Sequence, residues 1–455
     1  MEKLIVPKNY IFTSITAVLA TIGLSSCALH PTSIADEDKR NVLDVEAPFI
    51  AQVVGVQWLN PLQRQDYPTE WQLLWTLGKV RPNKKDDMVE QYPAIFSEVR
   101  SVSGIASSNG GKGTFFNFHG KYLRQMIAKF HGVYFSNPTY FYNAHDFKRK
   151  KGWNELAGIH VEYALPATRF DPLLAGAALR EEIIDTFSIG NPSFPNSWTK
   201  STPPDVRVTA GGGNAGFISL AAALDYLQAH PKETVWVMSW DAPSFPKDEQ
   251  INENMVLLVL AGPHYKTERD ALAWIGYPAT QQVSAFTAEK GLPPPTVQAW
   301  QATLAQAASN GRKLDTQIGY VIHDAHNTHP ASSDRIAHLA QTLTMELPAF
   351  DFHRQTFNTP ALLGEMGAAT ALTNVALGIA QANHFGQNVL VAGTGDAGQT
   401  SGVLILPPAK VRPIDPVKPW FRARGGGNAY LMWWGIRHAW ATLDAGQFNE
   451  QGYSK

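Results

Sequence analysis

Hydrophobic and polar positions follow orderly blocks from about residue 200 onward. Short apolar runs predict strands at 235–240, 255–261, 318–322, 389–392 and 403–406. Longer stretches with helical spacing predict helices at 214–230, 271–276, 295–309, 333–347 and 364–383. Because strands and helices alternate with short connections, the pattern predicts an α/β fold with a mixed or parallel sheet.

The pattern is less regular before residue 200. Residues 49–58 form a β-rich run, and a polar loop at 60–70 leads into a helix with Trp71, Leu74 and Trp75 at helical spacing. Residues 80–150 have no clean periodicity, so we expect this part to be rich in loops.

The N-terminus has the pattern of a secretory signal. An apolar run at 11–24 follows Lys3 and Lys8. At about 14 residues it is shorter than the roughly 20 needed to cross a bilayer, and it has the length of a signal-peptide core. It ends in Leu-Ser-Ser-Cys at 24–27, which resembles a bacterial lipobox and predicts a lipid-modified Cys27 that anchors the mature chain to a membrane. The alternative is a secretory signal that contains a cysteine by chance.

Composition excludes several classes of function. Lysine and arginine total 38 against 39 aspartate and glutamate, a formal charge of -1, so there is no electrostatic basis for nucleic-acid binding. The single cysteine, Cys27, excludes disulfides, thiolate metal sites and a cysteine nucleophile in the remaining chain. Thirteen tryptophans and 30 prolines suggest structured loops with aromatic anchors, which suit a protein that binds partners.

Four segments occur in an order typical of one enzyme superfamily. They are a glycine-rich helix start at 211–220, a strand and histidine turn at 319–326, a helix start at 364–371, and a glycine loop with a strand at 393–406. Together, residues 207–407 resemble the thiolase and ketoacyl-synthase superfamily. The resemblance implies a layered αβαβα arrangement with mixed sheets. It also implies a possible homodimer, because such domains commonly pair through their sheets.

The chemistry of that superfamily does not carry over. Its nucleophilic cysteine matches Gly213 or Asn214, and its second histidine matches Gly364; none of these can form an acyl-enzyme. Asn358 matches an asparagine used by one branch of the family. The resemblance therefore implies a vestigial pocket without catalytic residues or cofactor, made of Gly213, Asn214, His323, Asp324, His326, Asn358 and Gly364.

A second, narrower resemblance covers nearly the whole mature chain, and its signature lies near the start of the folded part. Residues 55–64 and 67–75 resemble the signature of the type VI secretion lipase-adaptor family. This resemblance implies a non-catalytic adaptor that binds a phospholipase effector and recruits it to the secretion spike protein. Loading of a spike takes place in the cytoplasm, whereas Cys27 predicts a lipoprotein of the cell envelope, and both locations stay open.

These resemblances divide the chain into five predicted parts. They are a signal peptide with lipobox at 1–27, a polar tether at 28–47, the first half of a thiolase-like body with loop-rich insertions at 48–200, a thiolase-like core at 201–407, and an aromatic helical extension at 408–455. In the last part, Trp433 and Trp434 either pack on the core or contact a partner.

Other motifs favour plain structural explanations. His323, His326 and His329 have a spacing that could serve a metal, but we expect them to be turn and helix-start residues. The glycines at 110–114 lack the spacing of a phosphate-binding loop, and no Gly-x-Ser-x-Gly nucleophile elbow occurs. The basic residues 148–151 suit a solvated turn or an anionic partner.

Two rival functions remain beside the adaptor. One is an enzyme that acts on an acyl group through Asn214, His323 and Asn358 without a cysteine, as a hydrolase or a lyase. The other is a ligand-binding lipoprotein that uses the same pocket.

Overall fold

The computed structural model describes most of the chain between Ala47 and Ile414. The described residues are 47–59, 69–81, 84, 87–94, 115–136, 159–169, 171–187, 189, 192–193, 204–243, 252–265, 270–325 and 330–414. By contacts, Ala47–Lys455 form one compact unit, separate from Met1–Glu46. Among the described helices, none combines the length and apolar character needed to cross a membrane.

The first half of the fold runs from β1 to β5. Its elements are β1 (Ala51–Leu59), α1 (Thr69–Thr76), α2 (Asp87–Gln91), α4 (Phe115–Ser136), β2 (His160–Pro166), α5 (Pro172–Thr186), β3 (Asp205–Gly211), α6 (Ala215–Ala229), β4 (Thr234–Asp241) and β5 (Asn254–Ala261).

The second half runs from β6 to β11. Its elements are β6 (Ala273–Ile275), β7 (Ala279–Gln282), η2 (Val283–Ala285), α7 (Pro295–Asn310), η3 (Asp315–Gln317), β8 (Ile318–His323), α8 (Pro330–Glu346), α9 (Phe352–Gln355), β9 (Thr356–Asn358), α10 (Thr359–Leu363), η4 (Gly367–Ala369), α11 (Thr370–Phe385), β10 (Asn388–Gly393) and β11 (Gln399–Leu406).

The two halves repeat the same strand arrangement. The sheet has the order β3-β2-β4-β5-β1-β6-β11-β10-β8-β9, with β7 paired to β11. In the first half β2 is parallel to β3 and β4, while β5 is antiparallel to β4 and β1. In the second half β8 is parallel to β9 and β10, while β11 is antiparallel to β10 and β6. The halves meet where β1 and β6 pair antiparallel, with Gln52 opposite Trp274.

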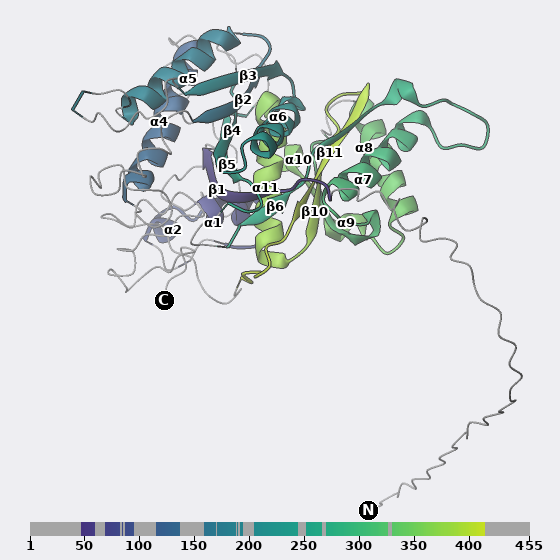
Figure 1. Ribbon diagram of the computed structural model, residues 1–455. Helices are drawn as coiled ribbons and strands as arrows, with labels where there is room; N and C mark the ends of the chain where they lie inside the picture. Colours follow the sequence, from purple (N-terminus) through teal and green to yellow (C-terminus); the bar gives the residue numbers. More distant parts are fainter. Residues whose placement is uncertain are drawn as a thin grey trace, which may run out of the picture. The chain divides into compact units, whose positions relative to one another are not determined.

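Three core clusters define five layers (Figure 1). One cluster packs α4 and α5 on the outer face of the first half of the sheet. A second packs α7 and α8 on the outer face of the second half. The largest joins α6, α11 and α1 to the inner faces of both halves. These layers follow the αβαβα order that the thiolase-like resemblance implied, so the expected fold class is confirmed.

Local sequence explains where key helices begin and end. Asp171 caps α5 by accepting a hydrogen bond from Leu173 N, and Pro172 occupies the first helical position. The central helix α11 is buried along nearly its whole length and is rich in alanine, as a helix between two sheets requires. It ends at Gly386, whose φ of 67° suits glycine.

The structure corrects several sequence predictions. Residues 271–276 are not helical, because Ala273–Ile275 form β6. The helix expected from residue 364 begins as η4 at Gly367 and becomes α11 at Thr370. The region at 80–150, which was expected to be rich in loops, contains the long helix α4. Cys27, 110–114, 148–151, His326, His329, Trp433 and Trp434 lie outside the described residues.

Candidate functional site

A polar cavity of about 170 Å³ lies where both halves contribute loops and helix starts. It is placed beyond the end of β8, beside the start of α6 and next to the segment that leads into α11. The residues that line it are Gly213, Asp324, Ala325, Arg335, Pro360, Glu365, Gly367, Thr370, Thr394 and Gly395. Two residues of the expected vestigial pocket, Gly213 and Asp324, therefore line one cavity.

Asp324 is the buried carboxylate of this cavity. Only 8 % of the residue is exposed. Its Oδ1 accepts hydrogen bonds from Thr394 N at 2.5 Å and from Thr394 Oγ1 at 2.8 Å. No hydrogen bond from another described residue reaches Oδ2. The second oxygen is thus available to whatever enters the cavity.

Burial and neighbouring groups act on the pKa of Asp324 in opposite directions. Burial raises the pKa above its usual value, the bonds from Thr394 oppose that rise, and the charge of Glu365 adds to it. Arg335, the basic residue of the lining, donates from Nη1 to the carbonyl oxygens of Thr394 at 2.9 Å and Gly395 at 2.8 Å. That guanidinium therefore braces the loop after β10 at the cavity wall.

The structure separates the two positions that matched a nucleophile. A Cβ on Gly213 would meet nothing closer than Asp324 Oδ2 at 3.7 Å, followed by Gly367 O and Thr370 Cβ at 4.0 Å. Gly213 therefore faces the cavity with open space above it. Asn214 instead has its buried side chain directed at Gly393, where an added Cβ would overlap Oδ1. Neither amide atom of Asn214 has a hydrogen-bond partner among the described residues.

The other expected residues lie around the cavity rather than in its wall. His323 is buried, and burial lowers its pKa to about 4, so the ring is neutral at pH 7. Its Nδ1 accepts from Ala325 N at 3.4 Å. Asn358 pairs with His323 between β8 and β9 and caps α10 through its side chain. Gly364 ends α10 with a φ of 73°, a backbone position that suits glycine.

Of the lining residues that the sequence interpretation missed, four have polar side chains. Arg335, Glu365, Thr370 and Thr394 come from α8, the loop after α10, the first turn of α11 and the loop after β10. Thr394 lies 70 residues from the aspartate that it contacts. No local motif links residues so far apart, so only the fold brings them together.

A buried ion pair lies behind Gly367. Asp241, at the end of β4, accepts from Arg169 Nη2 at 2.6 Å through Oδ1 and from Ala368 N at 3.0 Å through Oδ2. Burial raises the pKa of Asp241 to about 6, against the opposing effect of the Arg169 charge. Because Ala368 belongs to η4, Asp241 joins the first half of the fold to a wall of the cavity in the second half.

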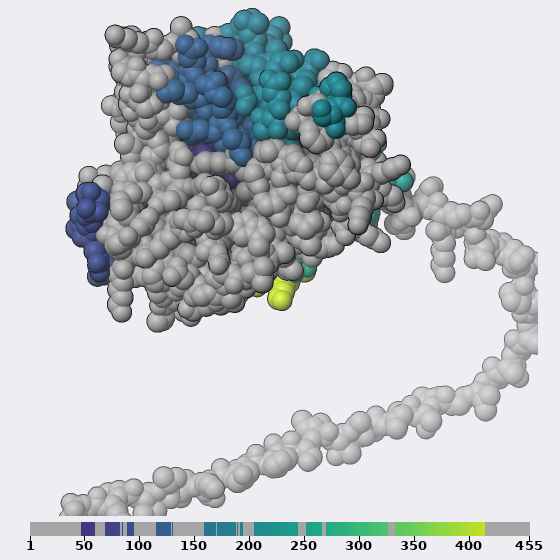
Figure 2. Space-filling model, turned by 90° about the vertical axis from the view of Figure 1, so that its left-hand side faces the viewer, coloured from purple at the N-terminus to yellow at the C-terminus, as the bar shows by residue number. Residues whose placement is uncertain are grey.

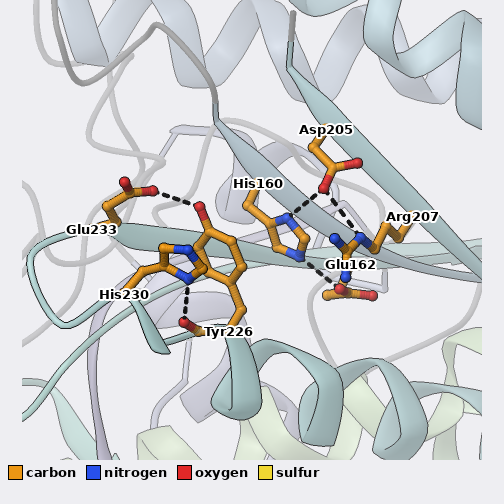
Figure 3. A network of polar contacts seen from close by, with 7 residues as sticks. All are labelled: His160, Glu162, Asp205, Arg207, Tyr226, His230 and Glu233. Carbon is orange, nitrogen blue, oxygen red and sulfur yellow. Dashed lines mark hydrogen bonds and ion pairs between the residues drawn. The ribbon is translucent and has the colours of Figure 1, made fainter. Parts of the chain in front are cut away.

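A second polar network lies at the other end of β2, the end at which that strand begins (Figure 3). His160 is buried, with Nε2 at 2.6 Å from Glu162 Oε1 and Nδ1 at 3.0 Å from Asp205 Oδ2. Arg207 Nε also donates to Asp205 Oδ2, at 3.1 Å. Each ring nitrogen of His160 thus lies within hydrogen-bond distance of a carboxylate, Glu162 on one side and Asp205 on the other.

Stacked rings from α6 cover this histidine (Figure 3). The ring centroids of Tyr226 and His160 lie 3.8 Å apart, at an interplanar angle of 4°. The ring of His230 also stacks on Tyr226, with the two centroids 4.2 Å apart. The Tyr226 hydroxyl donates to Glu233 Oε2 at 2.5 Å. The network joins β2, β3 and α6, and we assign it a structural role.

The described residues do not form a cluster of metal-ligating side chains. Within the described ranges, no group of three or more histidine, cysteine, aspartate or glutamate side chains could hold a metal ion. Of the three histidines whose spacing suggested a metal, only His323 lies in those ranges.

The solved structures that are similar to this chain include ketosynthases. The KS8 domain of the oxazolomycin ketosynthase OzmH from Streptomyces albus JA3453 is 12% identical over 83% of this chain and 100% of that one, with a TM-score of 0.47. The module 1 ketosynthase of bacillaene synthase from Bacillus amyloliquefaciens FZB42 is 9% identical over 79% and 76%, with a TM-score of 0.49. Because these identities and TM-scores are low, the assignment of the fold rests on the strand order and the layers alone.

A third similar structure is 3-oxoacyl-(acyl carrier protein) synthase III from Pseudomonas aeruginosa PAO1, at 13% identity over 80% of this chain and 99% of that one, with a TM-score of 0.42. No curated protein matches the chain. Residues 290–407, from just before α7 to the end of β11, match the family model described as "Type VI lipase adapter protein Tla3, C-terminal". The type VI lipase adapters, which residues 55–75 suggested, are thus the family matched by residues 290–407.

Proposed function

We propose that this chain is a non-catalytic adaptor that binds a phospholipase effector and recruits it to the type VI secretion spike protein. The observation that carries the proposal is the match of residues 290–407 to the type VI lipase adapter family, which indicates a lipase adapter role. The matched segment contains α7, α8, α11 and the strands β8, β9, β10 and β11, so it contributes most of the second half of the fold.

The cavity supports the non-catalytic part of this proposal. Ketosynthase-type chemistry needs a thiolate at the helix start that corresponds to the start of α6, as the resemblance implies, and the residue that faces the cavity there is Gly213. The neighbouring buried group, Asp324, is a carboxylate tied to Thr394 through one oxygen. A carboxylate at this place would also disfavour a second negative charge, such as a thiolate.

The experiment that tests adaptor function is an affinity pull-down of the tagged full chain from its native host, read by mass spectrometry. Cytosolic and detergent-solubilised fractions are analysed separately, and the tag alone is the control. Recovery of a lipase and a spike component at near-stoichiometric amounts supports the proposal. Recovery of neither from both fractions contradicts it.

We also propose a cell-envelope location through lipid modification of Cys27, with the cytoplasm as the alternative. The sequence before Cys27 supports this proposal because the apolar run and the lipobox-like residues are in register. Fractionation of the wild type and of Cys27→Ser, each labelled with a radioactive fatty acid, tests it. Label and membrane association that disappear together in the variant support the anchor, whereas an unlabelled, cytosolic wild type contradicts it.

A homodimer is the third part of the proposal. β3 forms an edge of the sheet and is flanked by α5 and α6. Large apolar side chains are exposed on these helices, with Leu173 77% and Ile218 59% exposed. Figure 2 shows the surface of the first half, where α4 in blue lies next to the blue-green residues of α5. Light scattering measures the molar mass of the wild type and of Ile218→Lys in solution. We expect a dimer for the wild type and a shift toward the monomer for the variant.

A further inference from the structure

We propose that the cavity between Gly213 and Asp324 is a binding site for a small primary amine in its ammonium form. This inference does not depend on adaptor function, because it concerns the ligand chemistry of the isolated protein. It rests on three properties of the cavity: the acceptor atoms that it presents, its size, and the hydrogen bonds that fix its wall.

The acceptor atoms come first. The space above Gly213 is bordered by Asp324 Oδ2, 3.7 Å from the place of a Cβ, and by the carbonyl oxygen of Gly367 at 4.0 Å. That carbonyl already accepts a hydrogen bond from Thr370 N, so the carboxylate oxygen is the main acceptor. Asp324 Oδ2 receives no hydrogen bond from another described residue, although Oδ1 receives two. An ammonium group carries three donors and no acceptor, so it matches a space that presents oxygen atoms.

The position of Asp324 argues against an anionic ligand. The first turn of α6 follows Gly213. The start of a helix carries the equivalent of about half a positive charge, so by itself it would favour an anion. Asp324 already places a carboxylate here, and Glu365 adds a second one to the lining, while the Arg335 guanidinium of the same lining donates to the carbonyl oxygens of Thr394 and Gly395. A carboxylate or phosphate ligand would meet Asp324 Oδ2 directly, whereas a donor would complete its hydrogen bonding.

The size and bracing of the cavity limit the ligand. Its volume of about 170 Å³ is close to that of an engineered cavity of about 150 Å³ that holds benzene. A ligand of about six heavy atoms therefore fits. The wall formed by Thr394 and Gly395 is held by Arg335, which donates to both carbonyl oxygens, so the acceptor geometry is set before a ligand enters.

The test uses three probes of matched shape: n-butylammonium, butyramide and butyrate, each titrated into the purified protein at constant ionic strength. Binding is followed by calorimetry. We expect n-butylammonium to bind with a dissociation constant on the order of 1 mM, which is reasonable for so small a ligand. Butyramide should bind roughly tenfold more weakly, because a neutral donor makes the weaker hydrogen bond, and butyrate should show no saturable binding.

Two variants locate the site. Asp324→Asn keeps an oxygen for Thr394 but turns an amide nitrogen toward the cavity, so n-butylammonium should lose roughly tenfold or more in affinity while butyrate gains. Gly213→Val fills the space above residue 213 and should remove binding of n-butylammonium and butyramide. Glu289→Gln, an exposed carboxylate remote from the cavity lining, is the matched control and should bind like the wild type.

Three results would overturn the proposal: no saturable binding of n-butylammonium, tighter binding of butyrate than of n-butylammonium, or ammonium binding that Gly213→Val leaves intact. If Asp324→Asn does not fold, Gly213→Val still tests the site, because its added Cβ makes no contact shorter than 3.7 Å. Adaptor function is read from the pull-down, so the two proposals fail independently.

Discussion

Asp324 Oδ1 accepts two hydrogen bonds from one residue, Thr394, whose backbone N–H and hydroxyl both point at it. The contact joins the end of β8 to the loop after β10 and so fixes one corner of the cavity. Thr394→Val keeps the backbone bond and the shape but removes the hydroxyl. We expect a loss of about 1–3 kcal/mol in the free energy of unfolding, because a buried carboxylate loses a donor.

Urea denaturation measures that loss. Thr344→Val is the matched control, because Thr344 is exposed and its hydroxyl donates only to a carbonyl of its own helix. The control should change stability by less than about 0.5 kcal/mol. Equal effects of the two variants would show that the hydroxyl of Thr394 contributes nothing to the corner.

Gly213→Cys restores a thiol at the start of α6, in a chain that also carries Cys27→Ser. The new Cβ has room, but the thiol would lie beside the Asp324 carboxylate. A like charge raises the pKa of a thiol, so we expect slower alkylation at pH 7 than for a free cysteine. Adding Asp324→Asn should speed alkylation severalfold, because only the helix start then acts on the thiol.

The rate is measured with an alkylating reagent by mass spectrometry. Asn214→Cys is the neighbouring control, since that side chain points at Gly393 rather than into the cavity. Faster alkylation of Gly213→Cys than of the form that also carries Asp324→Asn would contradict the charge argument.

Gly367 has a φ of 50°, and an added Cβ would overlap Asp241 Oδ2. Gly367→Ala should therefore destabilise the fold by about 3 kcal/mol or more, from backbone strain together with a steric clash. Gly120→Ala is the matched control, because Gly120 lies within α4 with no atom within 4 Å of the new Cβ. That change should stabilise by up to about 1 kcal/mol. Thermal unfolding of both variants distinguishes the two outcomes.

Asp241 makes stability depend on pH. Its pKa in the folded state is about 6, against an ordinary value of 3.8, so the folded protein holds the proton more tightly than the unfolded chain. The stabilisation is fully present below pH 3.8 and is lost as the pH rises through about 6. Between about pH 4 and pH 7 the wild type should lose about 2–3 kcal/mol relative to Asp241→Asn.

Denaturation at several pH values measures that difference. The opposite trend, in which the wild type gains on the variant as the pH rises, would mean that the ion pair with Arg169 outweighs burial and holds the pKa down.

His160 and Glu162 offer a test of the polar network in Figure 3. His160→Phe keeps a ring against Tyr226 but leaves the buried Glu162 carboxylate without its partner, which should cost about 3–5 kcal/mol. His160→Phe combined with Glu162→Leu should recover most of that loss. His264→Phe, at an exposed histidine, should have little effect. A double variant as unstable as the sum of the single variants would show that the pair is not coupled.

The sequence predicted the regular part of the fold because its strands are continuous apolar runs. β4, β5, β8, β10 and β11 are buried on both faces, and each was expected within a few residues. β2 was missed, since it carries His160 and Glu162 among its apolar residues and so lacks such a run. Only the contacts with Asp205 and Tyr226 explain how these polar groups are buried.

The candidate site was predicted in part. Gly213 and Asp324 were named from family-like segments and do line one cavity. Asn214 was grouped with them because it is the next residue, yet the turn into α6 directs it at Gly393. Arg335 and Thr394 were missed, because their roles depend on the pairing of β8 with β10, which no local pattern reveals.

The pairing of β11 with strands outside the matched segment limits what that segment can do alone. Residues 290–407 include β11 but neither β6 nor β7, its partners on the other side. They also include α11 without α6, β1 and β5, against which it packs. Expressed by itself, this segment would present an unpaired strand edge and a bare apolar helix to water, and it should aggregate. Residues 290–407 are therefore a dependent part of a larger folding unit, and a search for the surface that binds a partner needs the whole of that unit.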